Sequence, residues 1–397
     1  MKLAARVAKI KPSETLAITA KVNALRAQGR DVIGFGAGEP DFDTPDNIKK
    51  AAIQAIEAGF TKYTPVNGTD ELKDAIAAKL KRDNSLEYKR SQIVVSCGAK
   101  HSLYNLAQAL FDEGDEVIIP APYWVSYPDI VALSGGEPVI VDTQEENGFK
   151  MSPRQLSSAI TKRTRAVIIN SPSNPTGAVY TPQELKALAA VLVDKDILVI
   201  TDDIYEKIFY ADFPFANIAS VEEKMKEKTI VINGVSKTYA MTGWRIGYAA
   251  CSEEIAGAMS KIQSQSTSNP TSIAQKAALE AIRGDQSAMP QMVVEFRKRR
   301  DFIVEALNNI EGIDCFAPGG AFYVFPKVSG LYGRMFKGKK ITDSAEFIGY
   351  LLDEANVAAV PGAAFGSDEH IRLSYATSLQ NIEEGLKRIK NAVGRLD

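Results

Sequence analysis

The chain has 397 residues, of which 45% are apolar and 24% charged, a composition typical of a globular protein long enough for two domains. Its 47 basic and 49 acidic side chains leave a net charge of -2, which excludes a general electrostatic field for nucleic acid or an anionic membrane. Two histidines and three widely separated cysteines exclude a histidine-rich metal centre and a disulfide framework, so we expect no metal and a reducing, cytoplasmic setting.

The beginning of the chain predicts an arm and a loop. No apolar run approaches the ~18 to 20 residues of a membrane span, and we expect neither export nor a membrane anchor. A helix is expected near residues 13–28, ended by Gly29. The glycine-rich segment 34–45 has G-x-G-x-G spacing, which does not match the dinucleotide fingerprint and is typical of a pliable loop over a ligand. Residues 1–45 are too few to fold alone, and we expect them to join a small domain.

Short β-branched runs alternate with helical stretches through the middle of the chain. The expected strands are 93–96, 117–120, 138–142, 166–170, 197–202 and 229–234. This alternation is typical of an α/β fold with a mostly parallel central sheet and covering helices, in which ligands bind beyond the carboxyl ends of the strands. We assign residues 46–310 to this large domain.

The pattern changes beyond residue 310. Isolated strand-like pieces at 321–325, 357–360 and 371–375 precede a final amphipathic helix at about 381–396. These elements predict a smaller α+β domain, formed by residues 311–397 together with the N-terminal arm 1–45.

The loop after the expected strand 93–96 has the features of an anion site. Gly98 and Ala99 begin an amphipathic helix, whose free first-turn amides would bind a phosphate, and Gly98 permits close backbone approach. Lys100 opposes the helix dipole at this end, which an anion would explain. Many strand-to-helix loops contain glycine, so the motif is weak in isolation.

Two further loops follow expected strands and carry side chains suited to a flat heteroaromatic ligand. Trp124 could cover one face of such a ring, and a core or interface tryptophan is an equal alternative. Asn174, in the turn SPSNPTG, could donate its amide to an anionic ring oxygen, and the alternative is an ordinary proline and glycine turn.

The segment VITDDIYEKIFY ends a strand at Asp202 and places Tyr205 three residues later. A carboxylate that faces a pyridine nitrogen keeps it protonated, so that the ring accepts electrons, and the tyrosine could donate to the ring's phenolate oxygen. The alternative is a helix N-cap with a packed tyrosine. Asp202 precedes Lys237 by 35 residues, the length of one helix crossover, so neighbouring strands would deliver both side chains.

The segment NGVSKTYAMTGWRIGY carries Lys237 after a strand and Arg245 eight residues later. Desolvation at a strand end lowers the pKa of a lysine and frees its amine to form an imine, and the fork of an arginine matches phosphate oxygens. Alone, such a pair would more often be surface charges. Arg372 stands in a short apolar strand, where a guanidinium requires a carboxylate partner.

With these motifs in place, the chain resembles the class I aminotransferases of pyridoxal-5'-phosphate (PLP) fold type I. It is most similar to the bacterial aspartate aminotransferases of the subgroup shared with prephenate aminotransferases. The motifs that carry the resemblance stand in family order: AGEPDFDTP, KYTPVNG, PYWVSYP, SNPTG, DDIYE, SKTYAMTGWRIGY, GAFYVFP and RLSYATS. The resemblance implies that Lys237 forms a Schiff base with PLP. It also implies that Asp202 meets the pyridine nitrogen, that Tyr205 and Asn174 bind the ring oxygen, and that Arg245 binds the phosphate.

The resemblance also implies a substrate site and a homodimer. In the family, residues matching Gly38 and Arg372 hold the substrate α-carboxylate. The residue matching Trp124 flanks the cofactor beside Asn174, and the one matching Tyr63 reaches the phosphate in the neighbouring subunit's active site. Shared active sites of this kind imply a homodimer.

The chain departs from the family pattern near the lysine. Many relatives have a phosphate-binding serine three residues before it, where this chain has Gly234, with Ser236 directly before Lys237. The second arginine that binds the distal carboxylate of aspartate in the better-known enzymes has no counterpart. In this subgroup Lys100 resembles its substitute, and Lys11 resembles a position tied to prephenate activity.

We therefore expect ping-pong transamination between aspartate or glutamate and oxaloacetate or 2-oxoglutarate. Transamination of prephenate to arogenate, as a second or as the main activity, is the first alternative, and PLP-dependent C–S lysis is the second. A PLP-sensing transcription regulator is a non-enzyme alternative, which would need an added basic DNA-binding segment.

Overall fold

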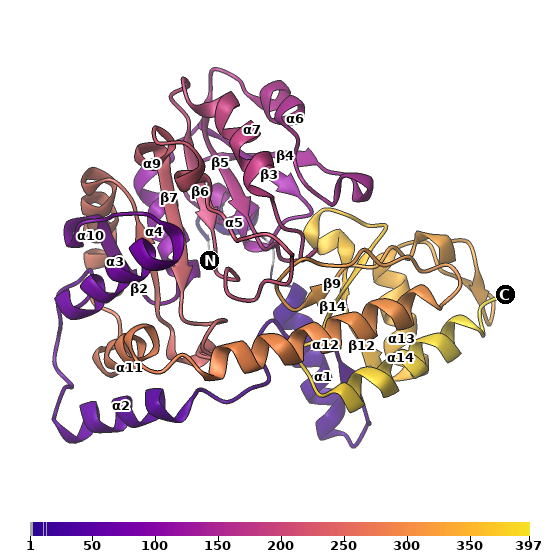
Figure 1. Ribbon diagram of the computed structural model, residues 1–397. Coiled ribbons are helices and arrows are strands. Elements are labelled where there is room, and N and C mark those ends of the chain that lie inside the picture. Colours follow the sequence, from indigo (N-terminus) through magenta and orange to yellow (C-terminus); the bar gives the residue numbers. More distant parts are fainter. Residues whose placement is uncertain (1–2, 11, 13) are drawn as a thin grey trace.

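The computed structural model describes residues 3–10, 12 and 14–397. A large sheet flanked by helices lies beside a second region of short strands and helices (Figure 1). The order of the seven-stranded sheet is β2 (Ile93–Ser96), β8 (Gly247–Ala250), β7 (Thr229–Gly234), β6 (Leu198–Asp202), β5 (Thr164–Asn170), β3 (Glu116–Ala121) and β4 (Glu137–Asp142). The predicted α/β fold with a mostly parallel sheet is confirmed.

The direction of the strands sets where the sheet can carry a site. Strands β4, β3, β5, β6 and β7 are parallel neighbours, and β8 is antiparallel to both β7 and β2. The six strands expected from the sequence are present, with ends that differ by at most two residues. Strand β8 was not predicted, because its sequence GYAA lacks the β-branched residues that mark the others.

Helices cover both faces of this sheet, as an α/β fold requires. One face is covered by α4 (Ala99–Leu110), α5 (Ser126–Leu133) and α10 (Glu253–Ser266). The other is covered by α6 (Pro153–Ala159), α7 (Pro182–Leu192), α8 (Ile218–Val221), α9 (Met225–Lys228) and, toward β2, by α2 (Asp46–Glu57), α3 (Asp70–Asn84) and α11 (Ser272–Arg283). The strands are buried on both faces, and their carboxyl ends are where polar side chains can gather.

The start of α7 illustrates how the local sequence sets these helices. The Thr181 hydroxyl accepts a hydrogen bond from the Glu184 amide at 3.2 Å, and the Glu184 carboxylate accepts one from the Thr181 amide at 2.8 Å. Pro182 occupies the first helical position, where no amide hydrogen is needed. This capping box begins the helix at the residue where the expected strand–helix alternation places it.

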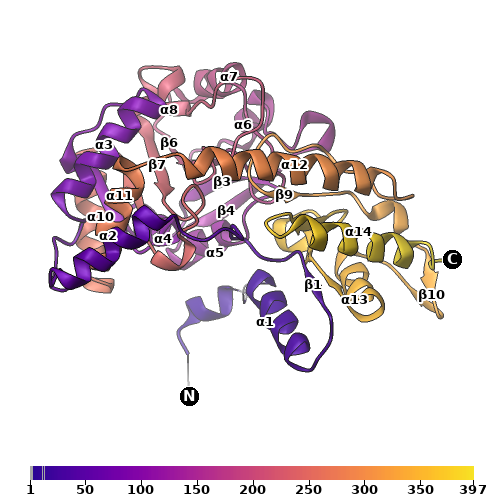
Figure 2. The same ribbon diagram turned by 60° about the horizontal axis from the view of Figure 1, so that its bottom comes forward.

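The second region joins both ends of the chain. Its three-stranded antiparallel sheet has the order β13 (Val360–Pro361), β14 (Ile371–Ser374) and β9 (Tyr323–Val324), and β1 (Ile33–Gly34) pairs with β12 (Val357–Ala358) in parallel. Figure 2 shows α1 (Glu14–Ala27) beside β1, and a hairpin of β10 (Met335–Phe336) and β11 (Lys339–Lys340) lies at the far end. The N-terminal segment is therefore part of this region's packing.

One core holds the second region together. It is formed by side chains of α12 (Ala288–Asn308), α13 (Ser344–Ala355) and α14 (Leu379–Val393), with Phe35 from the segment after β1. Much of α12 thus packs with the second region although it precedes residue 310 in the chain. The domain limits at residues 45 and 310 stay a prediction, as does the cytoplasmic setting. No helix among the described residues is long and apolar enough to cross a membrane.

Candidate active site

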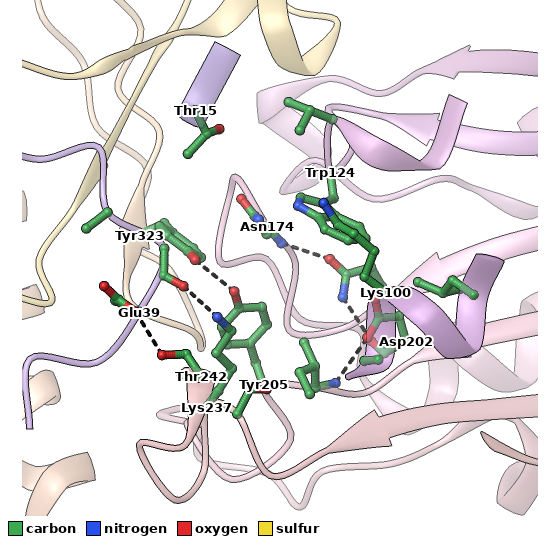
Figure 3. Close-up of a pocket in the computed structure, with 18 of the residues that line it drawn as sticks. Thr15, Glu39, Lys100, Trp124, Asn174, Asp202, Tyr205, Lys237, Thr242 and Tyr323 are labelled. Carbon is green, nitrogen blue, oxygen red and sulfur yellow. Dashed lines mark hydrogen bonds between the residues drawn. The ribbon is translucent and has the colours of Figure 1, made fainter. Parts of the chain in front are cut away.

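A cavity of about 390 Å³ lies at the carboxyl ends of β5, β6 and β7, where they face the start of α4 and the second region. Figure 3 shows Lys237, Tyr205 and Tyr323 on one side of it, and Asp202, Lys100 and Trp124 on the other. The predicted site residues that line it are Gly38, Ala99, Lys100, Trp124, Asn174, Asp202, Tyr205, Ser236, Lys237, Arg245 and Arg372. The roles assigned to them from the sequence stay predictions, whereas their gathering at one cavity is a structural fact.

Lys237 follows β7 by three residues and reaches into the cavity. Its Nζ donates a hydrogen bond to the Gly38 carbonyl oxygen at 2.5 Å. The pKa of Lys237 is lowered to about 8, chiefly by burial and also by the cations Arg245 and Arg372, whereas Glu39 opposes the shift. A substantial fraction of the side chain is therefore a neutral, nucleophilic amine near pH 8.

Asp202 closes the opposite side of the cavity at the end of β6. Burial raises the pKa of its carboxyl group to about 6, against the effect of two hydrogen bonds that favour the ionised form. The Tyr127 hydroxyl donates to Oδ2 at 2.7 Å, and the Ile204 amide donates to Oδ1 at 3.3 Å. The carboxyl group is thus mainly ionised at neutral pH and held in a fixed orientation.

Tyr205 lies one turn beyond Asp202 and meets a tyrosine of the second region. Its hydroxyl is 2.8 Å from that of Tyr323, which β9 supplies. Burial raises the pKa of Tyr205 well above its usual range, so the phenol is protonated and able to donate. The pair ties the large sheet to the second region at the cavity.

Arg372 is the largest buried cation at the site, with 1% of its surface exposed. It donates to Asn174 Oδ1 at 2.9 Å and to the Gly36 carbonyl oxygen at 2.8 Å, and its guanidinium carbon lies 4.6 Å from the centre of the Tyr323 ring. Within the described residues, its Nε has no hydrogen-bond partner. A buried guanidinium without a carboxylate is costly, so the site is suited to an anionic ligand.

Arg245 and the start of α4 form an anion corner. Gly98 has a φ of +92°, and a Cβ atom at this position would overlap the Arg245 guanidinium, so glycine is required for both reasons. Arg245 Nη1 donates to the Thr242 carbonyl oxygen at 2.8 Å, and Nη2 lies 3.4 Å from that of Cys97. Ala99 begins α4, whose free amides therefore face the cavity beside this cation.

The structure explains the glycine that stands where many relatives have serine. A Cβ atom on Gly234 would lie 3.0 Å from the Gly247 Cα and 3.0 Å from the Ile246 carbonyl oxygen. At this pair with β8, a larger residue would require the neighbouring backbone to move by a few tenths of an ångström. Ser236, two residues later, lines the cavity and is buried, which makes it the serine available there.

Lys100 and Trp124 lie together at the cavity. The Lys100 Nζ is 4.8 Å from the centre of the Trp124 ring, in the geometry of a cation–π contact. Burial lowers the pKa of Lys100, and the nearby Arg245 lowers it further. Arg245, Lys100 and Arg372 therefore place three cations around one space.

Among the described residues, two predicted ones, Gly98 and Tyr63, are not in the lining of this cavity, although Gly98 lies directly before Ala99, which is. Tyr63 lies between α2 and α3 with 91% of its surface exposed, away from the cavity of its own chain. Lys11 lies outside the described residues.

No role was predicted from the sequence for seven polar residues that line the cavity: Thr15, Thr19, Glu39, Tyr127, Asn170, Thr242 and Tyr323. Tyr127 and Tyr323 stand within motifs that carried the resemblance, PYWVSYP and GAFYVFP. Whether a tyrosine of these motifs points into the cavity depends on the backbone path. That path was not readable from spacing alone.

Comparison with known proteins agrees with this geometry. The family model described as aminotransferase class I and II matches residues 30–389. Aspartate aminotransferase of Bacillus subtilis is 53% identical over 99% of both chains, and aspartate/prephenate aminotransferase of Nitrosomonas europaea is 55% identical over 98% of this chain and 99% of the relative.

Solved structures lead to the same family. The aspartate aminotransferase from Rhizobium meliloti is 46% identical with a TM-score of 0.97 over 100% of both chains. That from Thermus thermophilus with maleate is 43% identical with a TM-score of 0.92, over 99% of this chain and 100% of the other. On these grounds, the chain belongs to the class I and II aminotransferase family.

Proposed function

We propose that the protein is a PLP-dependent aminotransferase that exchanges the amino group between aspartate or glutamate and the 2-oxo acids oxaloacetate and 2-oxoglutarate. The observation that carries the proposal is one cavity lined by the Lys237 amine, the Asp202 carboxylate and the unpaired Arg372 guanidinium. The names of the relatives, aspartate and aspartate/prephenate aminotransferases, support the same activity.

The residues of the cavity fit PLP. Lys237 would hold the cofactor through its amine, and the buried Asp202 carboxylate would hold the proton of the pyridine nitrogen. The phosphate would take the anion corner, where the glycine at position 98 leaves room beside the Arg245 fork and the Ala99 amide. When bound, PLP supplies an electron sink that stabilises the negative charge left at the substrate Cα.

The remaining cavity residues suit the ring. Tyr205 is a protonated donor for the ring oxygen. Asn174 accepts from Arg372 through Oδ1, which leaves its Nδ2 to donate to the same oxygen. Trp124 offers a flat surface for one face of the ring, and Ser236 offers a hydroxyl at the phosphate end.

Arg372 would bind the substrate, and Lys237 would move its proton. The Arg372 fork would bind the α-carboxylate, which gives its Nε the partner that the described residues do not provide. This contact orients the amino acid so that its Cα hydrogen faces Lys237. The Lys237 amine, with a pKa of about 8, would then take the proton from Cα and deliver it to the cofactor carbon that carries the amino group.

Lys100 would read the distal carboxylate. It lines the same cavity as Arg372, and its amine lies over the Trp124 ring. The Thermus thermophilus relative was solved with maleate, a dicarboxylate. A dicarboxylic substrate would neutralise one cation at each of its ends.

Replacement of Lys237 tests the proposal. We expect Lys237→Ala to lose multiple-turnover transfer from aspartate to 2-oxoglutarate by at least about 10⁴-fold, because neither the covalent anchor nor the proton carrier remains. The matched control is Lys276→Ala, which removes a partly exposed lysine paired with Glu71 and should leave turnover unchanged. Multiple turnover by Lys237→Ala at the wild-type rate would refute the assignment.

Prephenate is a second substrate that the relatives favour, since several of them carry it in their names. We propose that the enzyme also converts prephenate to arogenate. The test is kcat/KM for prephenate and for oxaloacetate as amino acceptors, in the wild type and in Lys11→Ala. A selective loss of prephenate turnover in the variant supports the role of Lys11, and an inert prephenate in the wild type removes this second activity.

We also propose a homodimer with shared sites, supported by the exposed Tyr63. Mixing inactive Lys237→Ala with weakened Tyr63→Phe subunits tests it. In the hybrid, the intact Lys237 of one subunit faces the intact Tyr63 of the other, so activity should exceed the sum of the two parents. An additive activity after mixing, with subunit exchange verified, would contradict the sharing.

A further inference from the structure

Gln263 of α10 is completely buried, and its amide uses all of its hydrogen-bonding capacity. Its Nε2 donates to the carbonyl oxygens of Val66 at 2.6 Å and Val95 at 2.9 Å. Its Oε1 accepts from the Ser96 hydroxyl at 2.6 Å and from the Asn105 amide at 3.0 Å. One side chain that touches no part of the cavity thus joins four segments.

Two of these contacts bracket the anion corner. Ser96 is the last residue of β2, and Asn105 stands in the second turn of α4. Gly98 lies between them and donates its amide to the Ser96 carbonyl oxygen at 2.7 Å. The strand and the helix on either side of Gly98 are therefore fixed to the same amide group.

Through its hydrogen bond to Val66, the Gln263 amide also holds residues 64–69, the segment after Tyr63. That segment pairs with β2 as well, because the Val95 amide donates to the Asn67 carbonyl oxygen at 3.0 Å. Residues 64–69 thus lie against the strand that ends in the anion corner. In the proposed homodimer, Tyr63, which directly precedes them, reaches the partner's phosphate.

A second buried glutamine provides a comparison. Gln275 of α11 accepts from the Thr69 amide at 2.8 Å and donates to the Thr64 hydroxyl at 2.9 Å and the Pro270 carbonyl oxygen at 2.8 Å. It holds residues 64–69 but makes no hydrogen bond to the described residues of β2 or α4. A comparison of the two glutamines therefore distinguishes the effect of residues 64–69 from the effect of the anion corner.

We propose that Gln263 is a positioning residue for the cofactor phosphate, because it fixes the backbone of the β2–α4 corner and, through Val66, the segment that carries Tyr63. The inference rests on the proposed function, since it concerns the phosphate of PLP. Loss of Gln263 would leave four polar groups without their partner, including the buried Ser96 hydroxyl. The corner would then relax away from the geometry in which its amides and Arg245 converge on one anion.

The test compares PLP with pyridoxal, which has the same ring and aldehyde but no phosphate. The full-length enzyme is freed of cofactor and titrated with each compound by absorbance. In Gln263→Met we expect the ratio of the two dissociation constants to move toward one by about tenfold, because only the phosphate contact is weakened. A general loosening of the fold would weaken both compounds together and leave the ratio unchanged.

Three further variants complete the test. Leu188→Ala makes a cavity in the core under α7, away from the site, and should lower Tm without changing the ratio. Ser96→Ala removes one of the four hydrogen bonds of Gln263 and should shift the ratio in the same direction by a smaller factor. This variant still tests the proposal if Gln263→Met fails to fold. Gln275→Met should shift the ratio less than Gln263→Met, because the corner keeps its contacts.

The outcomes distinguish this inference from the proposed function. A wild-type enzyme that binds neither compound, or that binds both equally, would overturn the PLP proposal itself. A wild type that prefers PLP, with Gln263→Met and Ser96→Ala retaining that preference, would overturn the role of Gln263 alone. A shift in Gln275→Met as large as that in Gln263→Met would overturn the role of the corner.

Discussion

Two parts of the cavity lining, a floor that includes Lys237 and Asp202 and a wall that includes Arg372, are built in different ways. On the floor, Lys237 and Asp202 follow neighbouring parallel strands, and each has a partner in the chain, the Gly38 carbonyl oxygen and the Tyr127 hydroxyl. On the wall, Arg372 comes from a short strand of the second region and keeps one buried nitrogen without a partner among the described residues. The floor residues thus have hydrogen-bond partners without a ligand, whereas Arg372 in the wall has one donor without a partner among the described residues.

This difference assigns the chemical step to the floor and substrate binding to the wall. A satisfied, buried floor is preorganised for chemistry and needs no substrate to hold its geometry. A buried guanidinium with a free donor gains most when an anion arrives. We therefore expect changes in the floor to affect the rate of the chemical step, and changes in the wall to affect binding and selectivity.

Asp202→Ala is the strongest test of the floor. We expect kcat to fall by about 10³-fold, because the carboxylate that would hold the ring proton is lost. Steady-state kinetics give the rate, and absorbance verifies that the cofactor is still attached. A larger effect on the KM for aspartate than on kcat would mean that the floor also binds substrate.

Arg372→Lys is the matching test of the wall. The lysine keeps the charge but loses the fork, and we expect kcat/KM for aspartate to fall by about 10²-fold. The pH titration of the bound cofactor's absorbance should remain that of the wild type. A shift in that titration would show that the two sides are electrostatically coupled.

Lys100→Met should change selectivity rather than rate. We expect the preference for aspartate over alanine, measured as a ratio of kcat/KM, to fall by about tenfold, because one charged contact to the distal carboxylate is removed. Alanine turnover itself should be nearly unchanged. An equal loss for both substrates would place Lys100 at the cofactor instead.

Tyr127→Phe should have the smallest effect, seen in the pH dependence of stability. Because the pKa of Asp202 is raised to about 6 in the folded protein, its stabilising contribution is present below about pH 4 and is lost as pH rises through 6. The Tyr127 hydroxyl limits that loss by donating to the ionised carboxylate. The variant should thus be destabilised by about 1 kcal/mol more at pH 7.5 than at pH 4.5.

Thermal denaturation of the cofactor-free protein at the two pH values measures this difference. Phe removes only the hydroxyl and keeps the ring packed against Trp124. An identical change in Tm at both pH values would show that the hydroxyl does not sense the charge of Asp202.

The floor was more predictable than the wall for a physical reason. Lys237 and Asp202 follow β-branched runs of a parallel sheet, and parallel strands bring their carboxyl ends to one edge. The wall depends on distant segments that meet only in the folded chain. Arg372 was predicted to need a carboxylate, but its contacts with Asn174 and Gly36 leave no sequence signal.

Interior partners were the least predictable. Tyr127 and Tyr323 stand in recognised motifs, but only the backbone path decides that their hydroxyls meet Asp202 and Tyr205. Gln263 has no motif at all, because an amide that joins four segments has no spacing rule. Buried hydrogen-bond hubs of this kind become visible only in three dimensions.

The hydrogen bond between Lys237 and the Gly38 carbonyl oxygen has a consequence for the evolution of the site. Its acceptor is a main-chain atom, so no side-chain replacement at position 38 removes the acceptor, and while Lys237 is kept the contact changes only if the path of the backbone changes. A Cβ atom at position 38 would lie 3.2 Å from the Tyr323 hydroxyl, so substitutions there would press on that path. The acceptor of the resting lysine is thus independent of side-chain identity, whereas lining residues such as Thr15 and Thr19 can be replaced without removing it.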